Sequence, residues 1–219
     1  MRVSPEQDGS GTGRDGGDDT GGAGDDNRAE GGGDDGSDGD GDGRDGENQP
    51  DDGSGGRNPD LVTEPSGEPG GTPSGPPTRI RPNEDADVRR SLERENSGAV
   101  ILADKGYDIT QNPTPAEVAQ ARQDSGDAGR PTSKPDYLVE GRVFDAYSPS
   151  ENKGARGIGF EVNEKVANEQ TQRVVLNLED WRGDMAKLQK QFDDWPVENL
   201  KELKAITPAG EIIQIVPKS

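Results

Sequence analysis

The stretch Arg173–Leu178, with the sequence RVVLNL, gives the strongest strand signal in the chain. Its consecutive aliphatic residues lack polar alternation, which is typical of a strand buried on both faces, so the segment predicts the centre of a sheet. Immediately upstream, Ile158, Val162 and Val166 recur every four residues and predict a helix that covers this sheet. Downstream, residues 185–192 show the same helical spacing.

Further segments extend this pattern outward from the central strand. The sequence predicts a helix over residues 92–103, a short strand over 107–111, a polar loop over 113–134 with one helical turn at 116–122, a hairpin of 137–140 with 143–147 around Gly141-Arg142, and a last hairpin of 203–206 with 211–216. This order predicts an α+β fold with a mixed central sheet of about 5–6 strands and three helices.

The composition divides the chain into unequal parts. Of 219 residues, 33 are Gly and only 25% are hydrophobic, and the net charge is −20, of which −15 falls in residues 1–86 and −5 in residues 87–219. Residues 1–58 are therefore expected to be a disordered Asp/Gly-rich tail, and residues 59–86 an extended Pro-rich linker. The foldable domain is expected at residues 87–219, and residues 1–86 are expected to be dispensable for catalysis.

The tail contains one possible cation motif. Asp38, Asp40 and Asp42 followed by Gly43 copy the start of an EF-hand loop, but the twelfth position is Gln49 where a bidentate Glu is needed. The tail is therefore predicted to be a spacer, with weak divalent-cation binding as the alternative.

Missing residue types restrict the chemistry. The chain contains no Cys and no His, which excludes disulfides, Cys- or His-ligated zinc and Ser-His-Asp triads. Catalysis therefore has to use carboxylates, Lys, Arg, Tyr or hydroxyls. The sequence shows no membrane-spanning apolar run, and no signal peptide is visible after Met1.

Two acidic residues of the central hairpin are candidate catalytic groups or metal ligands. Asp136 opens the first strand after Pro135, where a carboxylate could equally cap a turn. Asp145 alternates with Phe144 in the second strand, so it is either solvated or, if both faces of the sheet are covered, in need of a partner.

A second candidate group surrounds the helix and strand that follow. Cations and a hydroxyl here could bind a phosphate and stabilise its developing charge, whereas an ordinary charged helix surface is the alternative. The candidate catalytic residues in this region are Lys165, Thr171 and Arg173. The candidate substrate-binding residues are Arg142, Tyr147, Arg156 and Gln170.

The linear order of motifs resembles a known family. The blocks 135–147 (PDYLVEGRVFDAY) and 165–178 (KVANEQTQRVVLNL), with the weaker Gly and Pro positions at 96–113, resemble the CdiA C-terminal nuclease toxin domain of contact-dependent inhibition proteins and other bacterial polymorphic toxins. The resemblance covers residues 93–217. It implies a secreted or delivered endonuclease that cuts tRNA in the cytoplasm of a competing cell, and a cognate immunity protein as partner.

Two mechanisms fit the resemblance. In a metal-free ribonuclease, the favoured one, Lys165 and Arg173 stabilise the phosphate, and a carboxylate or a Lys of depressed pKa is the base. In a PD-(D/E)xK-like DNase, Asp136 and Asp145 hold a divalent ion. The expected acid-x-Lys element is missing, because Ala146 and Tyr147 follow Asp145.

A third alternative is a catalytically inactive binding module of the same fold. Its support is the net charge of −5 over residues 87–219, which is not the basic footprint of a nucleic-acid binder. A single basic patch would remove this objection. Its candidate members are Arg142, Lys153, Arg156, Lys165 and Arg173.

Overall fold

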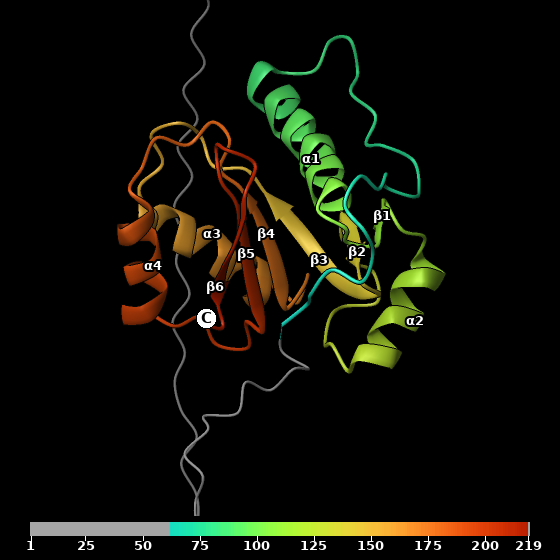
Figure 1. Cartoon of the computed structure of the whole chain (residues 1–219). Coiled ribbons are helices and arrows are strands. Elements are labelled where there is room, and N and C mark those ends of the chain that lie inside the picture. The colour runs from blue at the N-terminus through green and yellow to red at the C-terminus, as the bar shows by residue number, and fades with distance from the viewer. Residues whose placement is uncertain (1–61, 219) are drawn as a thin grey trace, which may run out of the picture. The chain divides into compact units, whose positions relative to one another are not determined.

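The computed structural model of the chain describes residues 62–218 (Figure 1). The predicted Asp/Gly-rich tail, including the EF-hand-like residues 38–43, lies outside the described residues. Between residues 62 and 218, no helix has the length and apolar character needed to cross a membrane.

Six strands form one mixed sheet in the order of the sequence. They are β1 (Ile109–Gln111), β2 (Tyr137–Val139), β3 (Arg142–Tyr147), β4 (Arg173–Asn177), β5 (Glu202–Ile206) and β6 (Ile212–Val216). Strand β4 lies parallel to both β3 and β5, and the other neighbours are antiparallel. The predicted mixed sheet is thereby confirmed.

Strand β4 lies inside the sheet and is buried along its whole length, as its apolar sequence predicts. Val174 and Leu176 pack on one side with residues of α3 (Ala155–Ala167) and α4 (Met185–Asp194). Val175 points to the other side, into a cluster with residues of α1 (Ala86–Asp104). The sheet is therefore covered on both faces, as Figure 1 shows.

The structure has four helices among its described residues, one more than predicted. The additional helix is α2 (Pro115–Ser125), where the sequence predicted a single turn. Only Val118 and Ala121 of this helix are buried, so its apolar periodicity is weak. Its stability comes from the N-terminus, where Thr114 and Glu117 form a capping box and Pro115 occupies the first turn.

The hairpin of β2 and β3 is present, with its turn one residue earlier than predicted. Glu140 and Gly141 form the turn with φ of 51° and 69°, the left-handed pair that a two-residue hairpin turn needs. Arg142 is instead the first residue of β3. The resulting register pairs Tyr137 with Phe144.

Residues 62–85, which we call the strap, precede α1 and lie against the domain. The sequence predicted residues 59–86 as an extended linker, and the strap contains no helix. Its backbone nevertheless bonds to the domain, since Gly67 N donates to Gly106 O and Gly70 N to Asp104 O, each at 2.9 Å.

Candidate active site

A cavity of about 420 Å³ brings four of the predicted site residues together. Asp136, Asp145, Lys165 and Gln170 all line it. The remaining lining residues are Arg130, Thr132, Ser133 and Lys134. Segments far apart in the sequence thus meet at one hollow that carries both acidic and basic groups.

The hairpin register places the two aspartates side by side. Asp136 directly precedes Tyr137, and Tyr137 pairs with Phe144, the residue before Asp145. The Asp136 carboxylate also accepts a hydrogen bond from the Ala146 amide at 2.7 Å, which fixes it to the neighbouring strand. The sequence predicted both aspartates as site candidates, and their proximity follows from the tight turn.

Lys165 extends from α3 to the hairpin. Its Nζ lies 2.9 Å from Asp145 Oδ2, and the Asp145 side chain is only 7% exposed. Both faces of the sheet are covered, so Asp145 needs a partner, and Lys165 supplies it. Burial alone would lower the pKa of Lys165, but the surrounding carboxylates, Asp145 foremost, outweigh burial and raise it. The raised pKa favours the charged form of Lys165, which suits a cation that stabilises a phosphate better than a general base.

Glu95 of α1 completes the cluster, and sequence reasoning missed it. Glu95 interacts electrostatically with Asp136, Asp145 and Lys165. Its own pKa is raised, first by burial, while a hydrogen bond from Thr78 opposes the rise. A signal was available: Glu95 follows Leu92 by three residues and precedes Ala99 by four, so it is a charged residue on the apolar stripe of a helix.

The resulting group contains three carboxyl groups and one lysine. We call it the acidic cluster, and its members are Glu95, Asp136, Asp145 and Lys165. The pKa of Asp136 lies well above its ordinary value, because burial disfavours the carboxylate and the charges of Asp145 and Glu95 repel it. The raised pKa favours the protonated form of Asp136, and the raised pKa of Lys165 favours its charged form. A proton donor and a cation at one cavity are groups that phosphodiester cleavage uses.

Two predicted catalytic residues lie away from the cavity, in the core. Arg173 is 1% exposed and forms ion pairs with Asp127 at 3.0 Å and Glu202 at 2.8 Å. The Thr171 hydroxyl is also buried and bonds to backbone, donating to Val143 O or Arg173 O. These contacts indicate that both residues stabilise the structure around the start of β4.

The predicted basic patch does not form as one surface. Lys165 lines the cavity of the acidic cluster, Lys153 and Arg156 line two other cavities, and Arg173 is buried. Tyr147 packs against the core cluster of β4, and Arg142 begins β3. Further positive charges beside the acidic cluster come from two residues that were not among the candidate site residues. They are Arg130 and Lys134.

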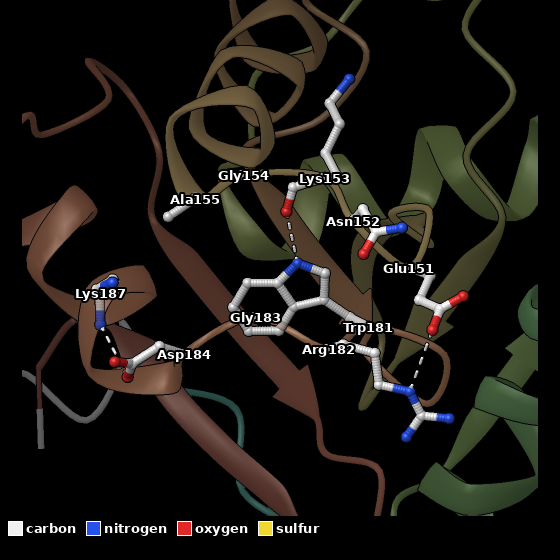
Figure 2. A pocket seen from close by; sticks show the side chains of 10 residues that line it. All are labelled: Glu151, Asn152, Lys153, Gly154, Ala155, Trp181, Arg182, Gly183, Asp184 and Lys187. Carbon is white, nitrogen blue, oxygen red and sulfur yellow. Dashed lines mark hydrogen bonds and ion pairs between the residues drawn. The ribbon is translucent and has the colours of Figure 1, made fainter.

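A separate cavity of about 390 Å³ surrounds Trp181 (Figure 2). The indole Nε1 donates to the Lys153 carbonyl at 2.6 Å, and Arg182 faces Glu151 across the opening. These contacts join the loop before α3 to the loop before α4. No residue of the acidic cluster lines this cavity.

The same carboxylates are the candidate ligands for a metal ion. Within residues 62–218, no group of three or more acidic side chains is arranged to hold a metal ion. Asp145 is bonded to Lys165 and Asp136 to the Ala146 amide. Asp136 and Asp145 remain the pair that a divalent ion would use.

Three comparisons relate the chain to known proteins. Residues 133–212 match the model of the contact-dependent growth inhibition CdiA C-terminal domain. A protein of Burkholderia pseudomallei (strain 1026b) named tRNA nuclease CdiA-2 is 36% identical over 164 residues, which are 75% of this chain and 5% of that protein. A solved CdiA-CT/CdiI toxin and immunity complex from Burkholderia pseudomallei is similar with a TM-score of 0.57 and 35% identity, covering 67% of this chain and 100% of the solved one.

Proposed function

Because the chain belongs to the contact-dependent growth inhibition CdiA C-terminal domain family, we propose that it is a nuclease toxin that cleaves tRNA in a competing cell. The name of the Burkholderia relative supports tRNA as the substrate. The toxin and immunity complex supports a cognate immunity protein as the partner that protects the producing cell. Delivery into the cytoplasm of the target cell is part of the same proposal.

The observation that carries this proposal is the meeting of Asp136, Asp145 and Lys165 at one cavity. Asp136 and Asp145 line this cavity with Lys165, and Glu95 adds a third carboxyl group that interacts with them. Grouping three carboxyl groups around one lysine is electrostatically costly, and such costs concentrate at functional sites. Arg130 and Lys134 at the rim supply positive charge for the phosphates of an RNA strand. This local positive charge can bind RNA even though the net charge of the domain is negative.

A metal-free transesterification is the mechanism that we favour. The 2′-hydroxyl of the RNA attacks the adjacent phosphorus and gives its proton to Glu95. The bond between phosphorus and the 5′-oxygen breaks, and Asp136 protonates the leaving oxygen. Lys165 stabilises the extra negative charge on the phosphate during the transfer, and Asp145 holds Lys165 in place. The products are a 2′,3′-cyclic phosphate and a 5′-hydroxyl end.

A divalent-ion mechanism is the second candidate, and the position of Lys165 is the observation that supports it. The strand lacks the acid-x-Lys element, but α3 places a lysine 2.9 Å from Asp145. Asp136 and Asp145 would hold the ion, which would supply an activated water for attack on the phosphate. The two mechanisms differ in their products and in their response to chelators.

The test is cleavage of bacterial tRNA by the purified chain, followed on a denaturing gel. We expect cleavage by the unmodified protein and a loss of about 100-fold or more for Asp145→Asn, since it releases Lys165. Asp193→Asn is the matched control, because Asp193 pairs with Lys218 on the surface. Intact tRNA with the unmodified protein would contradict the proposal and favour an inactive binding module.

The chemistry is decided with the same samples. Cleavage in EDTA that leaves a cyclic phosphate supports the metal-free mechanism. Cleavage abolished by EDTA and restored by Mg²⁺ or Mn²⁺ supports the divalent ion. Comparison of tRNA with duplex and single-stranded DNA identifies the nucleic acid that is cut.

A further inference from the structure

The strap reaches the acidic cluster at Thr78, and we infer that the strap is part of the active site, with Thr78 as a positioning residue for the Glu95 carboxylate. The inference rests on the proposed function, because Thr78 gains this role only if Glu95 acts on the substrate. Thr78 contacts Glu95 and holds it, and it is not itself expected to touch the RNA.

The strap is seated along β1 by its backbone. The Ser74 amide donates to Ile109 O, and the Gln111 amide donates to Ser74 O, both at 2.8 Å. Gly75 has a φ of +75°, and a Cβ at this position would lie 2.1 Å from Gln111 O. Only glycine permits this approach, so the strap cannot shift by one residue without a clash.

A second anchor holds the start of the strap in the core. Thr63 is 2% exposed, its amide donates to Glu202 Oε1 at 2.9 Å, and its hydroxyl donates to Glu202 Oε2 at 2.6 Å. Hydrogen bonds to a buried carboxylate are among the stronger ones in proteins. The strap is therefore fixed to the domain at Thr63 and at Ser74, both upstream of Thr78.

The hydrogen bonds around Thr78 give its hydroxyl a direction. The Asn112 side-chain amide donates to Thr78 Oγ1 at 2.7 Å, which leaves the single hydroxyl proton for Glu95 Oε1. The Asn96 side chain holds the backbone of Thr78 on both sides, accepting from its amide at 2.8 Å and donating to its carbonyl at 2.9 Å. Thr78 thus presents a donor of fixed direction to the carboxylate.

The electrostatic consequence can be measured. Burial raises the pKa of Glu95, and the hydrogen bond from Thr78 opposes that rise by stabilising the charged form. Removing the hydroxyl is therefore expected to raise the pKa of Glu95 further. Since Glu95 must be ionised to accept a proton, the acidic limb of the pH–rate profile should move to higher pH.

The test is the pH dependence of tRNA cleavage by full-length Thr78→Val and Thr78→Ser proteins. We expect Thr78→Val to lower kcat/KM by about tenfold and to shift the acidic limb upward, whereas Thr78→Ser keeps the hydroxyl and restores both. Thr72→Val is the matched control, because Thr72 lies exposed on the same strap. It should match the unmodified protein in rate, pH profile and Tm.

A second variant changes Asn112, the residue that donates a hydrogen bond to the Thr78 hydroxyl. In Asn112→Asp a carboxylate replaces the amide donor and competes with Glu95 for the hydroxyl proton, so the acidic limb should again move to higher pH. This variant decides the question if Thr78→Val does not fold. An unchanged profile in a folded Thr78→Val protein, or in Asn112→Asp if Thr78→Val is unfolded, would overturn the inference.

The inference and the proposed function fail in different ways. If Lys165→Ala cleaves tRNA normally, the proposed site is wrong. If Lys165→Ala is inactive while Thr78→Val keeps the unmodified profile, the site stands and the strap is only a structural element. Under this inference, the expectation that residues 1–86 are dispensable extends no further than residue 61.

Discussion

Asp145 and Asp127 are both buried carboxylates held by a lysine at nearly the same distance, yet they belong to clusters of different charge balance. Lys165 lies 2.9 Å from Asp145, and Lys201 lies 2.8 Å from Asp127. In the acidic cluster, Lys165 is shared among three carboxylates. Around Asp127, by contrast, cationic side chains outnumber acidic ones, and we call this group the basic cluster. Its members are Asp127, Arg173, Lys201, Glu202 and Lys204.

The two clusters differ in their pKa shifts as their charges require. Burial raises the pKa of Asp136 and nearby negative charges add to the rise. At Asp127, burial also acts to raise the pKa, but hydrogen bonds from Arg173 and Lys201 outweigh it and the pKa is lowered. The difference shows that a buried charged group is not by itself a site. The uncompensated cluster beside a cavity is the one suited to chemistry.

The largest expected effect on stability separates the clusters directly. Arg173→Met leaves Asp127 and Glu202 buried without their main partner, so we expect the free energy of unfolding to fall by about 3–5 kcal/mol. Urea denaturation at pH 7 measures it. A loss below about 1 kcal/mol would contradict the structural role and return Arg173 to the list of catalytic candidates.

A smaller loss is expected for the buried hydroxyl beside it. Thr171→Val removes the hydrogen bonds to the Val143 and Arg173 backbone and should cost about 1–3 kcal/mol of unfolding free energy. The rate of tRNA cleavage by the folded protein should stay within about twofold of the unmodified rate. A specific loss of cleavage in a stable protein would show that the hydroxyl acts at the site after all.

The smallest expected change in the free energy of unfolding is an increase. Asp136→Asn removes a carboxyl whose pKa is raised, so the protein should become more stable by about 1 kcal/mol at pH 7 while losing activity. A raised carboxyl pKa costs stability as pH rises from the unfolded value of about 4 through the folded pKa. The gain should therefore shrink towards pH 4. Equal stability of the two proteins across this range would contradict the raised pKa.

Much of the fold could be predicted from short-range pattern. The buried strand at β4 and the helix before it follow from apolar spacing alone, and the hairpin follows from its turn. The helix α2 could not be found in this way, because capping rather than an apolar face stabilises it. The docked strap could not be found either, since its bonds join residues far apart in sequence, such as Thr63 and Glu202.

The candidate site was predictable only where its residues are close in sequence. Asp136 and Asp145 are neighbours through a hairpin, so sequence proximity was a reliable guide. Lys165, Thr171 and Arg173 are also near one another in sequence, but of these three only Lys165 lines the cavity. Arg173 pairs with Asp127 in the basic cluster, and the Thr171 hydroxyl bonds to the Val143 and Arg173 backbone. Glu95 comes from a distant helix, and only its place on an apolar stripe identifies it.

The matched lysines give the most direct test of the claim that the acidic cluster is the nuclease site. The measurement is the single-turnover rate of tRNA cleavage by Lys165→Met and Lys201→Met proteins, each of which removes a lysine bonded to a buried aspartate. We predict a loss of about 1000-fold for Lys165→Met and a change within about twofold for Lys201→Met. Normal cleavage by the Lys165→Met protein, or an equal loss in both, would contradict the assignment.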